Sequence, residues 1–421
     1  MSHELKAQYW IETPLAVEKA AEMMAGEQSS GTFVKLRDET DELKSRHGAR
    51  IEAIKVLGNV ANPSLPGARA PVGKGHQPYT QAKVTLSWPQ ANLDPGLPTL
   101  LATVAGNLFE LNGFSGLRLI DLELPATFAA GLSGPKFGIE GTRRLCGVFD
   151  RPILGTIIKP SVGLSPQQTA ERVKELIESG LDFIKDDELM GDPPHSPFEK
   201  RVEAVMSVIN DFAQRTGKKP MFAFNLSGEI DQMRRRHDFL LKHGGTCAMA
   251  SLKWVGVSGI QELVRFSEVP IHGHRNGWGL FSRSPAIGIS YTVWQKIWRL
   301  AGVDHLHCNG LRNKFCESDE SVKSSVAACL TPLSRPDDCA MPVISSGQWA
   351  DQIPDTHKMV GGGDFMFLCG GGIVGHPAGA AAGVRSLLQA WESASRGITL
   401  GEFAVDHPEL REALAFFGQK N

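Results

Sequence analysis

From residue 151 onward, short apolar segments alternate with segments of helical pattern. The first pair is "RPILGTIIKP" (151–160) and "QQTAERVKELIES" (167–179), with Ser165 as the helix N-cap, Pro166 at the first helical position and Gly180 after the end. Seven further apolar segments follow, within residues 181–185, 220–226, 247–256, 269–274, 304–310, 342–347 and 365–372. Eight strands with helical spacers over roughly 250 residues predict a (β/α)8 TIM barrel.

A doubly wound open sheet is the structural alternative. It would need eight parallel strands, and the sequence has no dinucleotide-binding glycine fingerprint, so the barrel is favoured. The first part of the chain has a different pattern, with the strand-like "YWIETPL", "ARIEAIKVL", "QAKVTLSW" and "LRLIDLELP" and the helical "AVEKAAEMMAG" and "LPTLLATVAGN". We therefore expect an N-terminal α+β, ferredoxin-like domain over residues 1–145 and the barrel over residues 146–421.

Composition excludes several classes of protein. The net charge is -2 over 421 residues and there is no Lys/Arg-rich run, which argues against nucleic acid as a partner. No apolar stretch is long enough to span a membrane, and the polar start "MSHELKAQYW" is not a signal peptide. The seven cysteines are dispersed, without a CxxC motif, which predicts reduced thiols in a cytoplasmic protein.

Polar and glycine residues stand at the ends of most of the predicted strands, where a barrel places its chemistry. They are Lys159 after the first strand, Lys185, Asp187 and Glu188 after the second, His272, His274 and Arg275 in "HGHR", His305 and His307 in "HLHCNG", Ser345, Ser346 and Gly347 in "SSG", and Gly370, Gly371 and Gly372. Such groups at six of eight strand ends favour a functional site.

Each group suits a particular chemistry. Asp187 and Glu188 offer the oxygen ligands that Mg²⁺ prefers. Glycines expose backbone N–H groups that can hold a phosphate, and Arg275 with His307 can bind a second anion. A lysine buried at a strand end can lose its proton and act as a base or nucleophile.

Simpler interpretations remain for each group alone. Lys185 with its three acidic neighbours could be a solvated turn, an HxH pair is more often a core feature than a ligand set, and a lone GGG is usually a loop. The two HxH pairs also suggest a zinc hydrolase. The zinc barrels that we would compare carry HxH on the first strand, which here ends in lysine, so zinc ranks low.

Together these motifs resemble the RuBisCO large-subunit family. The similar segments are "GTIIKPSVGLSPQ", "GLDFIKDDE", "IHGHR", "DHLHCNG" and "CGGGIVGHPAG", in the family's order, with "GEQSSGTF" and "GNLFELNG" in the first domain. The resemblance implies that Lys185 takes up CO₂ to become a carbamate, which holds Mg²⁺ together with Asp187 and Glu188. The metal would polarise a carbonyl and stabilise an enediolate.

The resemblance also implies roles for further residues. Lys159 corresponds to the enolisation lysine, His274 to a histidine near the metal, and Lys314 to the lysine of the mobile sixth loop. Two sites for a phosphorylated substrate are implied, one formed by Arg275, His307 and Ser345, the other by Thr32, Gly347, Gly370 and Gly371. Glu27 and Asn107 correspond to residues that reach a neighbouring subunit's site, which implies a homodimer with shared active sites.

Departures from the family's pattern imply a different reaction. Ser161 stands where the carboxylases have a second lysine, Trp278 stands where a histidine is expected, and the sixth loop reads "NGLRNKFCE". The chain therefore resembles the RuBisCO-like proteins, called form IV, and CO₂ fixation is not expected.

Three functions fit these motifs to different degrees. The first is a Mg²⁺-dependent decarboxylase or transcarboxylase/hydrolase of a phosphorylated keto-sugar acid such as 3-oxo-isoapionate 4-phosphate, in sugar catabolism. Retention of Lys314, which handles a carboxylate in the carboxylases, favours it. The alternative is an enolase or isomerase of a methylthio-sugar phosphate, of the 2,3-diketo-5-methylthiopentyl-1-phosphate type, in methionine salvage. A catalytically silent scaffold is disfavoured, because the motifs for metal and phosphate are intact.

Overall fold

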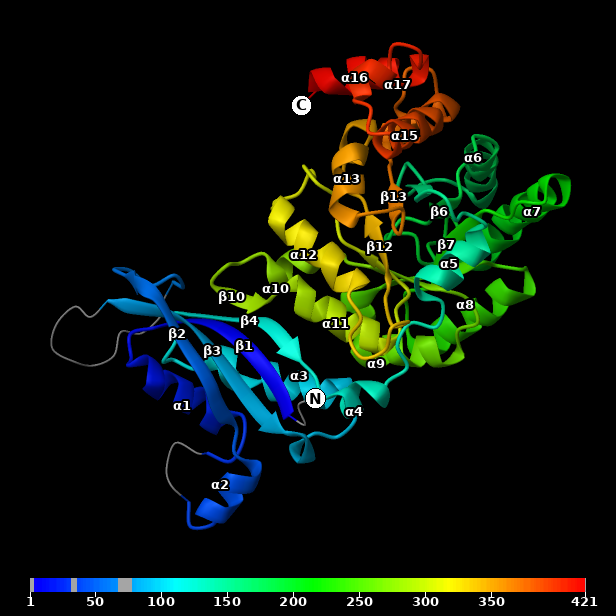
Figure 1. Ribbon diagram of the computed structural model, residues 1–421. Coiled ribbons are helices and arrows are strands. Elements are labelled where there is room, and N and C mark those ends of the chain that lie inside the picture. Colours follow the sequence, from blue (N-terminus) through cyan, green and yellow to red (C-terminus); the bar gives the residue numbers. More distant parts are fainter. Residues whose placement is uncertain (1–3, 32–35, 67–77, 421) are drawn as a thin grey trace. The chain divides into compact units, whose positions relative to one another are not determined.

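The computed structural model describes residues 4–31, 36–66 and 78–420 (Figure 1). Within them the chain forms two compact units. Unit 1 takes its residues from 1–133, 277–300 and 333–335, and unit 2 from 134–276, 301–332 and 336–421. Each unit contains its own β-sheet. The predicted boundary at residue 145 stays a prediction.

Unit 2 is built on a closed barrel of eight parallel strands, as the sequence predicts. In chain order they are β5 (Ile153–Ile157), β6 (Phe183–Lys185), β7 (Met221–Asn225), β8 (Cys247–Ser251), β9 (Ile271–His274), β11 (His305–His307), β12 (Met341–Ile344) and β13 (Met366–Leu368). Seven of the strands fall within the predicted apolar segments, and β12 begins at Met341, one residue before its predicted segment at 342–347. The closed barrel excludes the open-sheet alternative.

The interior of the barrel is apolar, with three buried histidines among its strands. Its core cluster consists of Val148, Ile153, Phe183, Met221, Ala223, Cys247, Met249, Met341, Val343, Met366 and Leu368. His272, His305 and His307 are also buried. Strands covered on both faces have continuous apolar sequences, which explains why these segments lack a simple alternation.

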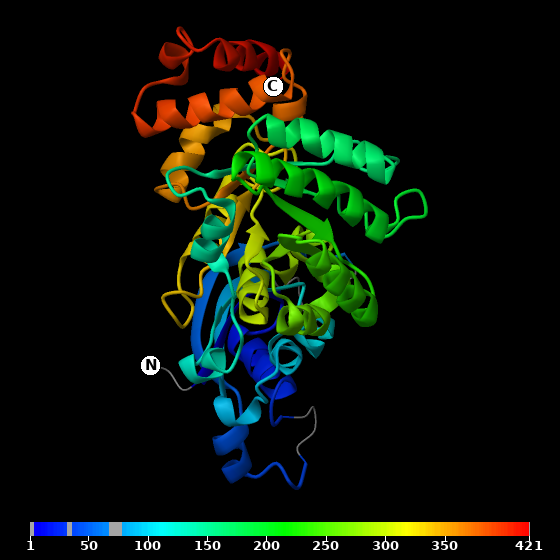
Figure 2. The same cartoon turned by 90° about the vertical axis from the view of Figure 1, so that its right-hand side faces the viewer.

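Helices surround the barrel (Figure 1). They are α5 (Gly138–Cys146), α6 (Pro166–Glu178), α7 (Phe198–Thr216), α8 (Ile230–Lys242), α9 (Leu252–Phe266), α12 (Asp319–Leu330), α13 (Ile353–Val360), α14 (Gly371–Val374), α15 (Ala380–Ser395), α16 (Leu400–Phe403) and α17 (Pro408–Phe417), with short 3-10 turns η3 (Ala350–Gln352) and η4 (Gly418–Lys420). Helices α6 and α7 lie side by side (Figure 2). Ser165 caps α6 in a capping box with Gln168, as predicted.

Unit 1 contains a five-stranded sheet in the order β10-β4-β1-β3-β2. The strands are β1 (Glu4–Thr13), β2 (Arg50–Val60), β3 (Tyr79–Pro89), β4 (Gly116–Glu123) and β10 (Ile287–Ile289). The first four are antiparallel in the order 4-1-3-2, with helices after β1 and β3, which is the expected ferredoxin-like arrangement. The helices of unit 1 are α1 (Val17–Glu27), α2 (Asp41–His47), α3 (Leu97–Ala105), α4 (Ala126–Ala130), α10 (Trp278–Ser282) and α11 (Tyr291–Ala301), with the turns η1 (Gln90–Asn92) and η2 (Asn107–Glu110).

The two faces of β1 differ in burial. Leu5, Ala7, Tyr9 and Ile11 are buried and alternate with half-buried residues, as a strand with one face on the core requires. The outer strand β2 is instead exposed along most of its length.

Strand β10 was not predicted. It pairs in parallel with β4, so residues 277–300 belong to unit 1 although they follow five barrel strands in the sequence. Among the helices in the described part of the chain, none has the length and apolar character needed to cross a membrane.

Candidate active site at the carboxyl end of the barrel

Lys185 is the last residue of β6, and its side chain is 1% exposed. Its Nζ donates to the backbone oxygen of Asp186 at 2.8 Å and lies 3.6 Å from Sδ of Met249. It also lies 3.8 Å from Oε2 of Glu188. Burial lowers the pKa of Lys185, against the opposing effect of the neighbouring carboxylates. The amine is thus closer to its neutral, nucleophilic form than an exposed lysine.

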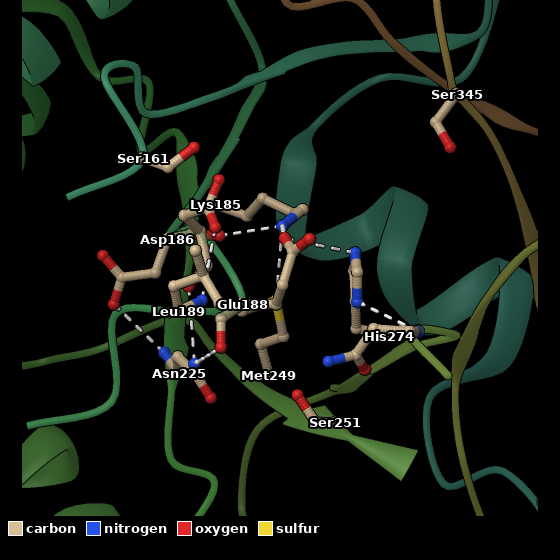
Figure 3. Close-up of polar contacts among 12 residues, drawn as sticks. Ser161, Lys185, Asp186, Glu188, Leu189, Asn225, Met249, Ser251, His274 and Ser345 are labelled. Atoms are coloured by element: carbon tan, nitrogen blue, oxygen red, sulfur yellow. Dashed lines mark hydrogen bonds and ion pairs between the residues drawn. The ribbon is translucent and has the colours of Figure 1, made fainter. Parts of the chain in front are cut away.

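Glu188 connects Lys185 to His274, the last residue of β9. Oε2 of Glu188 lies 3.5 Å from Nε2 of His274, and the three side chains converge in Figure 3. Burial, and then the charge of Lys185, lower the pKa of His274 to about 4. His274 is therefore neutral near pH 7, and its ring can accept or donate a hydrogen bond without adding charge.

Asp187 is bound by Lys159, which follows the end of β5. Nζ of Lys159 donates to Oδ2 of Asp187 at 2.7 Å and to Oγ of Ser161 at 2.6 Å. Burial would raise the pKa of Asp187, but hydrogen bonds from Lys159 and Ser161 lower it overall. Ser161 thus does more than replace the family's lysine, because it helps to hold Lys159 beside this carboxylate.

Asp186 points away from this group (Figure 3). Its Oδ2 accepts hydrogen bonds from Nε of Arg201 at 3.3 Å and from the backbone N of Asn225 at 3.1 Å. Arg201 lies on α7, is fully buried, and also donates to backbone oxygens of the loop between β6 and α7. Of the three acids after Lys185, Asp186 therefore anchors the loop, while Asp187 and Glu188 contact Lys159, Lys185 and His274 at the barrel mouth.

Asn225, which ends β7, was missed by the sequence analysis. Its Nδ2 donates to the backbone oxygen of Glu188 at 3.0 Å and to that of Asp187 at 3.4 Å, and its Oδ1 accepts from the backbone N of Ser227. The amide fixes the backbone that carries both candidate metal ligands. A polar residue ending the apolar "PMFAFNL" was the signal that could have revealed it.

Arg275 follows β9 and is held by a buried carboxylate. Its Nη2 lies 2.9 Å from Oε2 of Glu317, and the two side chains are 7% and 1% exposed. Glu317 also accepts from Nδ2 of Asn309 at 2.6 Å and from Oγ of Ser321. Glu317 therefore fixes the guanidinium of Arg275, a contact that the sequence did not predict.

His307 and Ser345 lie together at the ends of the neighbouring strands β11 and β12. Nδ1 of His307 is 3.1 Å from Oγ of Ser345, and Nε2 of His307 is 2.8 Å from Nε2 of His272. Burial lowers the pKa of His307 well below its ordinary value, so the ring is neutral. The anion-binding role implied for these two residues stays a prediction.

The loop after β11 places Lys314 on the surface, with Nζ 5.2 Å from the ring centroid of Phe315. The backbone N of Lys314 donates to the backbone oxygen of Ser346 at 3.1 Å. A Cβ on Gly347 would lie 3.3 Å from Cβ of Lys314, and the φ of Gly347 is +87°, so glycine suits this position on both grounds. The loop after β11 thus contacts the segment that follows β12.

Gly370 and Gly371 precede and begin the short helix α14, and a Cβ added to either would meet nothing within 4 Å. Their backbone is therefore open to a ligand. Gly372 is enclosed instead, because its Cβ would lie 2.5 Å from the backbone oxygen of Gln348. In unit 1, Nδ2 of Asn107 donates to Oε1 of Glu27 at 3.3 Å, so these two predicted residues are neighbours. Thr32 lies outside the described residues.

The donor set at the barrel mouth suits Mg²⁺ only if the lysine takes part. The described residues contain no cluster of three His, Cys, Asp or Glu side chains able to hold a metal. Asp187 and Glu188 supply two carboxylates, and the buried amine of Lys185 stands where a third oxygen donor would be needed. A carboxyl group added to that amine would supply it, so the residues fit a carbamate-assisted magnesium site.

Comparisons with known proteins agree with the fold and with these motifs. Residues 138–417 match the ribulose bisphosphate carboxylase large chain, catalytic domain, and residues 3–128 match its N-terminal domain. The 3-oxo-isoapionate-4-phosphate transcarboxylase/hydrolase of Xanthobacter autotrophicus is 52% identical over 418 residues, 99% of this chain and 100% of that protein. The 3-oxo-isoapionate-4-phosphate decarboxylase of Rhizobium rhizogenes is 46% identical over 411 residues, 97% of each chain.

A solved structure is similarly close. The crystal structure of a rubisco-like protein from Burkholderia fungorum matches with a TM-score of 0.92 and 46% sequence identity, covering 99% of this chain and 100% of that one. The matches to both family domains confirm the resemblance that the motifs indicated. The chain therefore belongs to the ribulose bisphosphate carboxylase large-chain family and is one of its RuBisCO-like enzymes.

Proposed function

We propose that the protein is a Mg²⁺-dependent transcarboxylase/hydrolase or decarboxylase of 3-oxo-isoapionate 4-phosphate. The observation that carries the proposal is the convergence of Lys185, Glu188 and His274, with Asp187 beside Lys159, at the carboxyl end of the barrel. The two relatives that are 52% and 46% identical to this chain supply the substrate. The same relatives support a place in carbohydrate metabolism.

Lys185, Asp187 and Glu188 would hold the metal. The lone pair of the neutral Lys185 amine attacks the carbon of CO₂ and the nitrogen releases one proton, which leaves a carbamate with two oxygens and one negative charge. The burial that lowers the pKa of Lys185 favours this reaction, because only the neutral amine is a nucleophile. When bound, Mg²⁺ polarises the keto group of the substrate and stabilises negative charge on its oxygen.

A 3-oxo acid carries its carboxylate β to a ketone, so breaking the bond to the carboxyl carbon leaves an electron pair that the keto group can accept. Lys159 would move a proton at the adjacent carbon, and the contacts that hold its amine between Asp187 and Ser161 support this role. Lys314 would approach the substrate's carboxylate when its loop closes. Both lysines match the roles implied by the family resemblance.

The phosphate would be bound at the barrel mouth. Arg275 supplies the charge beside His307 and Ser345, and the open backbone of Gly370 and Gly371 can donate N–H groups to an anion. Glu317 keeps the guanidinium in place between turnovers. Gly347 and Thr32 belong to this proposal on the basis of the family motif alone.

We also propose a homodimer with shared active sites. Glu27 and Asn107 are exposed and hydrogen-bonded to each other, so they form one polar group available to a neighbouring subunit. Strand β2 exposes Val56 and Leu57 at 56% and 46%, which favours cover by a partner. The seven free cysteines support a reducing, cytoplasmic location.

The test uses 3-oxo-isoapionate 4-phosphate with a ¹³C label in its carboxyl carbon, with Mg²⁺ and bicarbonate present. The proposal expects the label either in CO₂ and bicarbonate, for a decarboxylase, or in a new carboxylic acid, for a transcarboxylase/hydrolase. Exchange of substrate protons with solvent deuterium, without cleavage of the labelled bond, would favour the enolase alternative. A substrate recovered unchanged would contradict the proposed function.

A further inference from the structure

Three histidines form a continuous contact through the core of the barrel. Nδ1 of His305 lies 3.3 Å from Nδ1 of His272, and Nε2 of His272 lies 2.8 Å from Nε2 of His307. The ring of Phe183 packs against His272 and His305. Burial lowers the pKa of His305 to about 3 and those of His272 and His307 well below the ordinary value, so all three rings are neutral.

A hydroxyl group stands at each end of this contact. At one end, Nε2 of His305 lies 2.8 Å from Oγ1 of Thr142 on α5. At the other, Nδ1 of His307 lies 3.1 Å from Oγ of Ser345, which follows β12. The histidine chain, as we call it, consists of Thr142, His305, His272, His307 and Ser345.

The direction of the hydrogen bonds along the histidine chain is set at Thr142. Its Oγ1 lies 2.5 Å from the backbone oxygen of Gly138, which can only accept, so the Thr142 hydroxyl must donate there. Oγ1 of Thr142 is then an acceptor for Nε2–H of His305. A neutral imidazole has one donor and one acceptor nitrogen, so Nδ1 of His305 must accept.

The same reasoning assigns the donor and acceptor nitrogens of His272 and His307. Nδ1–H of His272 donates to His305, which makes Nε2 of His272 an acceptor. Nε2–H of His307 donates to His272, which makes Nδ1 of His307 an acceptor. The hydroxyl of Ser345 must therefore donate to His307. The opposite direction would leave the oxygens of Thr142 and Gly138 2.5 Å apart with no proton between them.

A second set of contacts near Ser345 is consistent with this direction. Glu317 accepts from Nδ2 of Asn309, so Oδ1 of Asn309 is free to accept from Oγ of Ser346 at 2.7 Å. The hydroxyl proton of Ser346 is thus donated to Asn309 and does not point to Ser345. The 3.4 Å separation of the two serine oxygens is longer than the contact of Ser345 with His307.

We propose that the histidine chain fixes Ser345 as a hydrogen-bond acceptor toward the substrate. Thr142, His305 and His272 act as positioning residues, since they act through His307 and Ser345. The group of the substrate that contacts Ser345 is then a hydroxyl donor, and not the phosphate oxygen that the family resemblance implies for this serine. The charge of the phosphate is met by Arg275 and by backbone N–H groups instead. The identity of the substrate group rests on the proposed function, whereas the assignment of the histidine tautomers does not.

The first test is neutron diffraction of the deuterium-exchanged protein without substrate. The proposal expects deuterium on Nδ1 of His272, on Nε2 of His305 and His307, and on Oγ of Ser345 in the direction of His307. Deuterium on Nδ1 of His307 or on Nε2 of His272 would overturn it. Because no substrate is needed, this outcome is independent of whether the proposed function is correct.

The second test compares Thr142→Val, which removes the hydroxyl and keeps the shape, with Thr142→Ser, which keeps the hydroxyl. Thr142→Val should give mixed tautomers at His272 and raise KM by about five- to tenfold, the worth of one hydrogen bond, with a smaller change in kcat. Thr142→Ser should restore both. Unchanged tautomers and KM in Thr142→Val would contradict the proposal, as would an equal loss of activity in both variants.

Discussion

Lys185 and Asp186 are adjacent in the chain, but their side chains point to different sides of the strand. Side chains at the end of a strand alternate between its two sides, so Lys185 faces the barrel mouth while Asp186 faces Arg201 on α7. The Asp186–Arg201 pair is buried, with side chains 1% and 0% exposed. Burial raises the pKa of Asp186, and the charge of Arg201 opposes this rise.

Arg201→Leu should destabilise the protein by about 3–5 kcal/mol, because it leaves the carboxylate of Asp186 buried without its cation. The neighbouring Lys200→Met, whose side chain is 69% exposed, is the control and should change stability by less than about 0.5 kcal/mol. Urea denaturation measures both. A loss below about 1 kcal/mol in Arg201→Leu would show that the pair is not an anchor.

Sequence patterns predicted Lys185, Asp187, Glu188, Lys159 and His274 at this site, because each follows an apolar strand of a barrel. The partners of these residues were not predicted. Arg201 lies on a helix whose buried face is also apolar, and Asn225 needs the neighbouring strand in register to reach the backbone of Glu188. Such contacts depend on how elements pack, which residue spacing alone does not give.

At the scale of elements, the loop between β11 and α12 is fastened at several points. Arg312 pairs with Asp351 and Asp355 through contacts that are half exposed, and Asn313 donates to the backbone oxygen of Gly310. Exposed ion pairs contribute little each, so the part of the loop around Arg312 and Lys314 can leave its position at modest cost while Glu317 stays paired with Arg275. We propose that such a movement brings Lys314 toward a bound substrate.

Lys314→Met tests the proposed contact between this loop and a carboxylate. If Lys314 stabilises the carboxyl group during bond cleavage, kcat should fall by about 10²–10³ while deuterium exchange at the substrate persists. Lys323→Met on α12, also exposed and cationic, is the control and should leave kcat unchanged. An unchanged kcat with a raised KM in Lys314→Met would favour the enolase alternative.

The eight barrel strands were predictable because most of them are apolar runs and a helical segment separates each strand from the next. Strand β10 was not, since no long apolar run surrounds it and its partner β4 lies about 170 positions earlier in the sequence. The order of the N-terminal sheet follows from hydrogen-bond partners across long separations, and only the presence of its strands could be read from alternation in sequence.

At the scale of the whole molecule, buried neutral histidines make stability depend on pH. The folded pKa of His305 is about 3, below its unfolded value of about 6.5, so the unfolded chain binds one more proton between these values. Stability should therefore fall as the pH drops below about 6.5, with a slope of about 1.4 kcal/mol per pH unit from this residue.

His305→Gln removes that titration and keeps a side chain able to donate and accept. The unfolding free energy of this variant, measured by urea denaturation between pH 6 and 5, should decrease less steeply than that of the natural protein. The two slopes should differ by about 1.4 kcal/mol per pH unit, the contribution of one proton. Asp304, whose pKa burial raises to about 6, acts in the opposite direction and is present in both proteins. Equal slopes would contradict a neutral, buried His305.

We propose that Lys185 holds Mg²⁺ as a carbamate for turnover of 3-oxo-isoapionate 4-phosphate. The most direct measurement is the rate of substrate consumption against Mg²⁺ concentration, at saturating bicarbonate, for the natural protein and for Lys185→Ala. We predict Mg²⁺-dependent turnover that is abolished by a chelator in the natural protein, and none in Lys185→Ala, whose circular dichroism should show an intact fold. Full Mg²⁺-dependent turnover in Lys185→Ala would contradict the claim.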